Sequence, residues 1–525
     1  MAEAIPAAAL AKNGHGVTEP VVELVKAFST PFSNAVATAR TCYSAKGIIP
    51  DEAINLEAGG RDRAIAESIY QAGHHTTFQH AQFQFALSGI SRQFIWSFLH
   101  SHPFYNSEQV SQRYVKLKAD AIYYPALSGK AAEVYSSAVE MQLAAYRELR
   151  ETLFPVAEAE YYRLFPARGR RPDDYRKGIL KKAQEAARYV APVATLAYLY
   201  HTISGITLLR YWRICQMGDV PEEQRKVVGL MVRAVLDHEP DYEIILQEPL
   251  EADDFTIFPW LEDPAPAPGF REQFDASLEG RHSRLVDYKA NSEAVLADAV
   301  REVLGATATE LDDDEAIALA LDPARNKLYG ETLNLTTHDK LSRTLNHPGY
   351  TFRKKLSHAA DSQDQRHRMT PGSRPLLATH LSGDPDFITP VLIQADEAAR
   401  HIYSDAMDRT WEAIGRLKQL GVPAETANYL LPNGVAVRFT ESADLLNLHH
   451  KHRMRLCYLA QEEIWRASVD EAEQVREVHP RIGKYLLPPC TLRQMASTRP
   501  ICPEGDRYCG VKVWKLDIGE YERLL

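Results

Sequence analysis

The sequence lacks a surplus of basic residues. Its 525 residues carry 60 Lys and Arg against 70 Asp and Glu, which gives a formal net charge of -10. Proteins that coat nucleic acid concentrate Lys and Arg, because they neutralise many phosphates at once. The composition therefore excludes a nucleic-acid partner of that kind. Any phosphate-bearing ligand is expected to be small and held by a few local side chains.

Long apolar runs are also missing. No stretch approaches the roughly 20 consecutive apolar residues that a membrane-spanning helix needs. The first residues, MAEAIPAAALAKNGHGV, have neither the basic start nor the sustained apolar centre of a signal peptide. We therefore expect a cytoplasmic protein with no membrane partner.

Cysteine is sparse, and the glycine-rich loops of common nucleotide-binding folds are absent. The six cysteines are scattered at Cys42, Cys215, Cys457, Cys490, Cys502 and Cys509. This spacing is not a disulfide framework, so we expect reduced thiols. The last three leave a metal site open, but the C-x-x-C spacing of a zinc knuckle is missing, and no metal ligand is assigned. Without a Walker or Rossmann loop, the chain does not bind nucleotides in either of those common ways.

Two domains of similar length are indicated. The segment LEDPAPAPGF alternates Pro and Ala, which favours an extended spacer. It predicts a first domain over residues 1–263, a linker over 264–269 and a second domain over 270–525. Apolar residues at three- and four-residue spacing predict long helices over 130–154 and 389–421, and HAQFQFALSG alternates as a half-buried strand does.

The two halves resemble one another. AARYVAPVATLAYLYHTISG, around Pro192, is similar to TANYLLPNGVAVRFTESAD, around Pro432. A second alignment, with a two-residue gap, matches Ser91-Arg92 with Ser342-Arg343 and Gln112-Arg113 with Gln365-Arg366. These parallels favour a tandem duplication over chance similarity between two helical domains.

Several segments, in the same order, resemble the flavin-dependent thymidylate synthases, the ThyX family. GHHTTFQHAQFQF is similar to the family's Gly-His-Glu-Thr/Ser-x-Phe-Glu-His segment. SEQVSQRY resembles the end of its signature, which is Arg-His-Arg, a fixed interval, Ser and then Arg-Tyr. LLNLHHKHRMRLCYLAQEEIW resembles its C-terminal helix, in which an arginine precedes Ala-Gln-x-Glu-Ile. The resemblance implies an α+β chain of two tandem ThyX-like domains, each with a small antiparallel sheet and several long helices.

The two halves depart from the family pattern in complementary ways. The first half has His100-Ser101-His102 at the Arg-His-Arg position, and alignment on Arg366 gives the second half Arg353-Lys354-Lys355, with Asp364 at the serine position. The arginine before the family's Leu-Pro turn is Arg188 in the first half and Asn428 in the second. The helix arginine is Cys215 in the first half and Arg455 in the second. Since the family builds its deoxyuridylate site across subunits, we expect one composite site between the halves and a decayed mirror image.

The resemblance assigns roles to particular residues. Arg113 and Arg188, with Ser111, are expected to grip the nucleotide phosphate, since guanidinium groups bind phosphate oxygens bidentately. Arg455 is the predicted catalytic residue, placed at the uracil edge where negative charge develops. The predicted dUMP ligands are Glu108, Gln109, Ser111, Arg113, Arg188 and Arg353. The predicted FAD ligands are His74, Thr76, Gln79, Arg353, Lys354, Lys355 and His450.

The activity implied is reductive methylation of dUMP to dTMP with FAD as cofactor, and with NADPH and methylenetetrahydrofolate as co-substrates. Small pyrimidine nucleotides and folate would be the ligands, and two tandem chains would associate as a dimer. Two other functions stay open: C5 alkylation of another pyrimidine nucleotide, and a decayed paralogue that binds nucleotide or FAD or only assembles. The family's flavin-contacting Asn, Arg and Asn fall on Asp444, Leu446 and His450. Outside the motif, His74-His75 and KKLSH would be ordinary surface groups.

Overall fold

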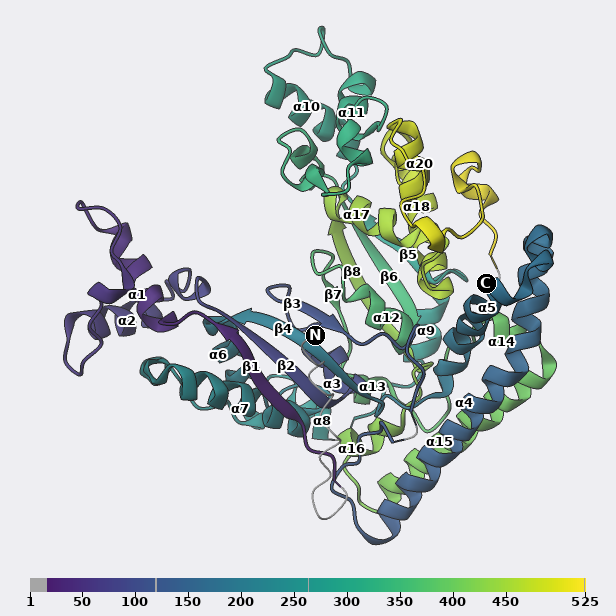
Figure 1. Ribbon diagram of the computed structural model, residues 1–525, viewed down its shortest axis with the longest axis horizontal. Helices are drawn as coiled ribbons and strands as arrows, with labels where there is room; N and C mark the ends of the chain where they lie inside the picture. The colour runs from purple at the N-terminus through teal and green to yellow at the C-terminus, as the bar shows by residue number, and fades with distance from the viewer. Residues whose placement is uncertain (1–16, 119, 263, 524) are drawn as a thin grey trace. The chain divides into compact units, whose positions relative to one another are not determined.

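The computed structural model of the chain describes residues 17–118, 120–262, 264–523 and 525 (Figure 1). Most of the N-terminal segment considered above, and residue 263 at the expected end of the first domain, lie outside these ranges. The chain forms two compact units. The first comprises the residues up to Leu143, Ala191–Ala265 and Arg409–Leu431, and the second comprises Ala144–Val190, Pro266–Asp408 and Pro432–Leu525.

The first unit is built on a four-stranded antiparallel sheet. Its strands are β1 (Val21–Ala27), β2 (Gln82–Ser91), β3 (Asn106–Gln109) and β4 (Leu196–Ser204), in the order β1-β2-β4-β3. Strand β2 confirms the strand expected at HAQFQFALSG, since Phe83, Phe85 and Leu87 are buried on one face and alternate with less buried side chains. The helices of this part of the chain are α1 (Pro31–Cys42), α2 (Arg61–Gln71), α3 (Arg92–Leu99), α6 (Gly205–Arg213), α7 (Pro221–His238), α8 (Phe258–Glu262) and α16 (Ala424–Ala427).

The second unit repeats this plan. Strands β5 (Ser283–Tyr288), β6 (Gly349–Ser357), β7 (Gly372–Ser373) and β8 (Ala436–Asp444) form an antiparallel sheet in the order β5-β6-β8-β7. Its helices include α5 (Pro172–Ala187), α9 (Phe270–Ala276), α10 (Ser292–Leu304), α11 (Asp313–Leu321), α12 (His358–Asp364), α13 (Leu377–His380), α14 (Val391–Gln394), α17 (Leu445–Arg455), α18 (Glu462–Val478), α19 (Pro480–Gly483) and α20 (Pro489–Met495). The matching sheets and the helices around them confirm the α+β class with two tandem domains.

Two long helices carry the chain from one unit into the other. They are α4 (Gly129–Leu164) and α15 (Glu397–Gln419), and they confirm the helices expected over 130–154 and 389–421. The second expected helix is interrupted, because α14 ends at Gln394 before α15 begins. Gly421 follows α15 with a φ of 80°, a left-handed conformation that glycine adopts without steric cost.

The compact units do not coincide with the sequence halves, because each unit contains one segment of the other half. In the first unit Tyr429 donates a hydrogen bond to Glu223 Oε2 (2.6 Å), and Glu223 also accepts from Ser91 N and Ser91 Oγ. In the second, Tyr189 donates to Glu463 Oε2 (2.5 Å), and Glu463 accepts from Ser357 N and Ser357 Oγ. The same buried triad therefore forms twice, each time with a tyrosine from the other half of the sequence.

This repeated triad corrects the sequence alignment of the halves. Ser91 is the N-cap of α3 and Ser357 is the N-cap of α12, and each is the last residue of the second strand of its sheet. Ser357 is therefore the counterpart of Ser91. The match of Ser91-Arg92 with Ser342-Arg343 was wrong, because Ser342 and Arg343 lie in a 3-10 turn (Ser342–Asn346) that precedes β6.

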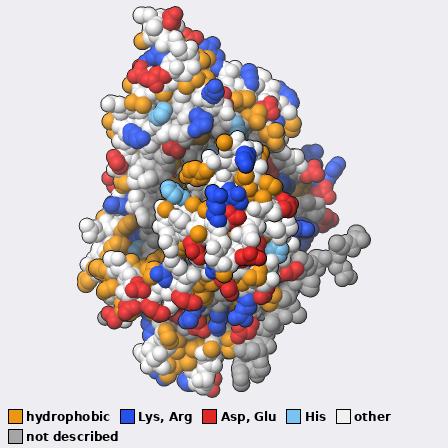
Figure 2. Space-filling view, turned by 90° about the vertical axis from the view of Figure 1, so that its left-hand side faces the viewer, with side chains coloured by type: hydrophobic (Ala, Val, Ile, Leu, Met, Phe, Trp, Pro, Cys, Tyr) orange, Lys and Arg blue, Asp and Glu red, His pale blue; other side chains and the backbone are white. Residues whose placement is uncertain are grey.

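The surface agrees with the charge balance of the sequence. On the face drawn in Figure 2, Lys and Arg side chains are interspersed with Asp and Glu rather than gathered in one basic field. Among the described residues, no helix combines the length and the apolar character that crossing a bilayer requires.

Candidate functional site

The corrected alignment reveals an Arg-His-Arg triplet in the second unit. Arg366-His367-Arg368 begins nine residues after the N-cap serine Ser357, and His100-Ser101-His102 begins nine residues after Ser91. The second half therefore carries the family triplet unchanged. The assignment of Arg353-Lys354-Lys355 to this position was wrong, since these residues lie within strand β6.

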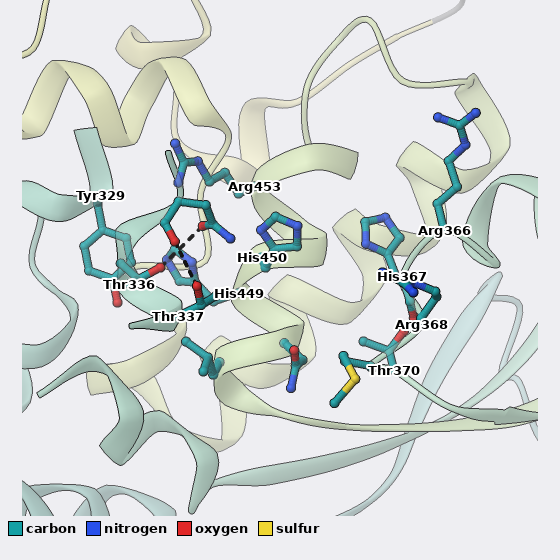
Figure 3. Close-up of a pocket in the computed structure, with 14 residues that line it drawn as sticks. Tyr329, Thr336, Thr337, Arg366, His367, Arg368, Thr370, His449, His450 and Arg453 are labelled. Atoms are coloured by element: carbon teal, nitrogen blue, oxygen red, sulfur yellow. Dashed lines mark hydrogen bonds between the residues drawn. The ribbon is translucent and has the colours of Figure 1, made fainter. Parts of the chain in front are cut away.

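The triplet lines a pocket of about 230 Å³ (Figure 3). The lining residues are Tyr329, Asn334, Thr336, Thr337, Arg366, His367, Arg368, Met369, Thr370, Leu446, Asn447, His449, His450 and Arg453. Three of them are arginines and none is Asp or Glu. Figure 3 shows the triplet at one end, Tyr329, His449 and Arg453 at the other, and His450 between them. A cationic lining without carboxylates is suited to an anionic ligand.

Arg455 and His367 form a direct pair beside this pocket. Arg455 Nε donates to His367 Nε2 at 2.8 Å, and Arg455 Nη2 donates to the carbonyl of Gln363 at 2.5 Å. Because a guanidinium only donates, His367 accepts with Nε2 and carries its proton on Nδ1. Burial and the neighbouring Arg455 hold the pKa of His367 well below its usual range. The predicted catalytic arginine is thus oriented by the central histidine of the triplet.

The other pocket histidines are also neutral. Burial, reinforced by Arg453, lowers the pKa of His449 to about 3, and the same two causes lower the pKa of His450. His450, a predicted flavin ligand, faces His367 with ring centroids 6.2 Å apart. The positive charge of the pocket therefore comes from Arg366, Arg368 and Arg453. Guanidinium groups keep that charge at every working pH.

The strand residues first taken for the triplet occupy other positions. Lys354 is fully buried, and its ammonium group lies 2.8 Å from Asp364 and 3.0 Å from Glu471. Lys355 pairs with Asp275 of α9 at 2.6 Å, and the Arg353 guanidinium lies 5.4 Å from the ring centre of Phe274. None of the three lines the pocket. Their contacts are those of a covered sheet rather than of an open ligand site.

The predicted nucleotide loop lies in the first unit. Glu108 is exposed on the edge strand β3, and Gln109 Oε1 accepts from Arg92 Nη1 at 2.7 Å. Ser111 Oγ accepts from the backbone N–H of Arg113, and the Arg113 guanidinium lies 5.6 Å from the ring centre of Tyr114. The structure thus brings Glu108, Gln109, Ser111 and Arg113 together at one edge of the sheet.

The remaining predicted ligands fall in two places. His74, Thr76 and Gln79 are exposed in the turn before β2 of the first unit. Arg188 follows α5 in the second unit, where it is buried and its carbonyl accepts from Asn433 Nδ2 at 3.1 Å. Arg188 therefore belongs to a different compact unit from Arg113.

Sequence reasoning missed most of this pocket. The signal for the triplet was present as the literal letters RHR, but the basic run RKKLSH lies only a few residues earlier and was aligned in its place. No local pattern marks Tyr329, Thr336 or Arg453, which the fold brings together from separate segments. For the cysteine tail, no group of three or more His, Cys, Asp or Glu within the described ranges is arranged to hold a metal ion.

Comparisons with known proteins agree with these motifs. The family model of the thymidylate synthase complementing proteins matches residues 23–241 and 284–481. The flavin-dependent thymidylate synthase of Geobacter sulfurreducens is 30% identical over 216 residues, which are 38% of this chain and 90% of that protein. The enzyme of Sulfurisphaera tokodaii is 31% identical over 154 residues, which are 29% of this chain and 59% of that protein.

A solved structure is also similar, at a greater distance. The structure of a UMP/dUMP methylase PolB from Streptomyces cacaoi, bound with 5-Br dUMP, is 23% identical and covers 43% of this chain and 95% of its own, with a TM-score of 0.30. The two matches of the family model together cover well over half of the chain, once in each half. The chain therefore belongs to the family of thymidylate synthase complementing proteins, the ThyX family.

Proposed function

We propose that this protein is a flavin-dependent thymidylate synthase that methylates dUMP reductively to dTMP, with methylenetetrahydrofolate and NADPH as co-substrates. The observation that supports this most is the intact Arg366-His367-Arg368 triplet on a pocket with three arginines and no carboxylate in its lining. Guanidinium forks match the oxygens of a phosphate group, so this lining suits a phosphate-bearing ligand.

The pocket suits the anionic part of FAD. A dinucleotide carries a diphosphate, and the guanidinium groups of Arg366, Arg368 and Arg453 offer forked donors that match phosphate oxygens. A pocket of about 230 Å³ is below the usual size for a whole drug-sized ligand, so it would hold one portion of the cofactor. When bound, the flavin supplies the one-carbon and hydride chemistry, and the chain needs no nucleophile of its own.

The residues of this chain would act by binding and by stabilising charge. Arg113 and Arg188, with Ser111, would bind the nucleotide phosphate, and Glu108 and Gln109 would orient the nucleotide. Arg455 would lie at the uracil edge, where a fixed cation stabilises the negative charge that develops at the ring. His367 would hold Arg455 in place through their 2.8 Å hydrogen bond. In this proposal Arg366, rather than Arg353, is the signature arginine that binds the ligands.

A second candidate is the same chemistry on a different pyrimidine nucleotide. It is favoured by the helix α17, where the family's Asn, Arg and Asn are replaced by Asp444, Leu446 and His450. Asp444 is used locally, as the N-cap that accepts from the backbone N–H of Asn447 at 2.8 Å. One or two hydrogen bonds to a hydroxyl group of the substrate decide which nucleotide is preferred. The side chains that line the nucleotide site, rather than the fold, therefore determine the substrate.

Two measurements test the proposal. The purified full chain should carry, or take up, a yellow flavin chromophore, and it should release tritium from [5-³H]dUMP in the presence of methylenetetrahydrofolate and NADPH. Release from [5-³H]UMP instead would support the second candidate. No flavin binding and no release from either nucleotide would leave only a decayed relative.

We also propose that two chains associate as a dimer, in which two tandem chains take the place of the four subunits that the family uses. Multi-angle light scattering on the full chain should give twice the mass of the monomer. A stable monomer would contradict this arrangement and would require the composite nucleotide site to form within one chain.

A further inference from the structure

A network of buried charged groups lies within the second unit. Lys354 of β6 contacts Asp364 at 2.8 Å, Glu441 of β8 at 3.3 Å and Glu471 of α18 at 3.0 Å. Lys451 of α17 contacts the same three carboxylates, with Glu441 the nearest. His452 shares one hydrogen bond with Glu471 at 3.0 Å. All of these side chains are at most 1% exposed.

The network extends to one further ion pair. Arg374, which follows β7, donates to Asp361 of α12 at 2.7 Å and lies 3.7 Å from Glu441. Burial alone disfavours charge, but Asp364, Glu441 and Glu471 hold the pKa of Lys354 well above its usual value. Likewise Lys354 and Lys451 hold the pKa of Asp364 well below its usual value, against the effect of burial. Lys354 and Asp364 therefore remain ionised because they are paired, whereas burial and the neighbouring Asp364 raise the pKa of Glu441.

The fold does not require charge at these positions. Phe98 lies seven residues after the N-cap Ser91, as Asp364 does after the N-cap Ser357. Relative to the N-caps Ser204 and Asp444, His201 corresponds to Glu441 and Tyr211 corresponds to Lys451. Phe98 packs with ring centroids 4.9 Å from His201 and 4.2 Å from Tyr211. The same sheet and helices are thus completed once by an aromatic cluster and once by ions. Because well-packed apolar residues often stabilise as much as a buried ion network does, stability alone does not explain the ions.

The ionic version occurs in the unit that has the cationic pocket. Asp364 precedes Arg366 by two residues at the end of α12, and Lys451 follows His450 directly on α17. Helices α12 and α17, which border the pocket, are therefore held in place by the same network of ion pairs. Asp364 and Lys451 also act electrostatically on His367, which holds Arg455.

We infer that the buried ion network is a positioning device for the anion pocket, with Asp364 and Lys451 as positioning residues that fix α12 and α17 relative to each other. Charged pairs have a narrower optimal geometry than an apolar contact, and each Lys ammonium here is shared among three carboxylates from different elements. Such a junction specifies the separation of Arg366 and His450 more tightly than packing would. This inference rests on the proposed function, in that the pocket must bind an anion.

The test uses inorganic pyrophosphate as the probe, titrated calorimetrically into the full chain. The main variant carries Asp364→Phe, Glu441→His and Lys451→Tyr, which copy the first unit and leave Lys354 with Glu471 and Arg374 with Asp361. We expect this variant to unfold cooperatively, above the temperature of the titration, but to bind pyrophosphate at least tenfold more weakly. Binding within twofold of wild type in a folded variant would overturn the inference.

A second variant guards against misfolding of the first. Asp364→Asn keeps the shape of the side chain and removes one charge, and it should weaken pyrophosphate binding about threefold to tenfold. It should also lower the melting temperature, because Lys354 and Lys451 lose one carboxylate partner, so binding is measured well below the transition. Tyr211→Phe in the first unit is the matched control and should leave binding unchanged. If Asp364→Asn binds as wild type does, the inference fails. Absence of binding by the wild-type chain would instead overturn the anion pocket, and the proposed function with it.

Discussion

The two units solve the same structural problem with different chemistry. Each has a sheet of the same strand order, a serine at the strand–helix junction and a buried glutamate that binds this serine. In the first unit the signature position is His100-Ser101-His102, and His102 packs against Tyr211 with ring centroids 4.9 Å apart. In the second it is Arg366-His367-Arg368 on a cationic pocket. Two similar units can therefore share a framework while the signature position is packed among aromatic rings in one and lines a cationic pocket in the other.

The largest expected effect separates the two signature positions. Arg366→Ala should reduce dTMP formation by two to three orders of magnitude, since loss of one guanidinium that stabilises a bound or developing anion costs about 3 kcal/mol. The matched variant His100→Ala should retain most of the activity, because its position is part of the aromatic packing of the first unit. Steady-state tritium release measures both. Equal losses would show that both positions serve working sites.

The two buried glutamates should make the stability of the protein depend on pH. Burial raises the pKa of Glu223 and the pKa of Glu463 to about 7 each, despite the hydrogen bonds they accept. A carboxyl group whose pKa is raised by folding binds its proton more tightly in the folded state, so the free energy of unfolding should fall as the pH rises from about 4.5 to 7. Each group contributes about 3 kcal/mol to this decline at most.

Denaturant unfolding at several pH values measures that slope. Glu223→Gln and Glu463→Gln should each remove an equal part of it, because the two triads have the same geometry. If only one variant flattens the profile, the two units differ in electrostatics as well as in function. If neither does, the glutamates are charged throughout this range in the folded protein.

Flavin affinity should depend on the Arg366-His367-Arg368 triplet and not on Arg353 of strand β6. Arg368→Ala should weaken FAD binding by about 2 kcal/mol, as expected for the loss of a charged hydrogen bond to phosphate. Arg353→Ala should leave the affinity within a factor of two, because Arg353 lies against Phe274 and not on the pocket. Flavin fluorescence titration distinguishes the two. If FAD affinity fell strongly in Arg353→Ala and not in Arg368→Ala, the cofactor would bind at strand β6 rather than at the pocket.

The smallest effects are expected for Tyr189 and Tyr429, each of which binds a glutamate from the other half of the sequence. Tyr189→Phe and Tyr429→Phe each remove one hydrogen bond to a buried carboxyl group and should lower the free energy of unfolding by about 1–2 kcal/mol. The ring itself stays packed, so little else changes. If the free energy of unfolding fell in only one of the two variants, the tyrosine hydrogen bond would stabilise only one of the two units.

Much of the fold could be predicted from the sequence, because its signals are local. The alternation at Phe83 and Phe85 identified a strand, and the helical spacing identified α4 and α15. The alignment of the second half failed because β6 contains Arg353, Lys354 and Lys355, and a basic strand looks like a basic signature when burial is unknown. Lys354 shows the difficulty directly, since only its three carboxylate neighbours make a buried lysine acceptable.

The exchange of segments was beyond sequence reasoning for a different reason. Hydrophobic periodicity describes which face of an element is buried but not which partner buries it. Tyr189 and Tyr429 lie in equivalent segments, and nothing in either segment indicates that it packs with the other half. Glu223 and Tyr429 are 206 residues apart in the sequence, and Tyr189 and Glu463 are 274 apart.

These separations also govern how the molecule is made. The first unit needs Leu430, whose carbonyl accepts from Gln142 Nε2 at 2.7 Å, so it cannot close until most of the chain has left the ribosome. Its sheet and α7 must wait during synthesis with apolar surface uncovered, and contacts of such long range form slowly. Unlike a domain made of one continuous segment, the first unit therefore reaches its native state only after residues as far as Leu430 have been synthesised.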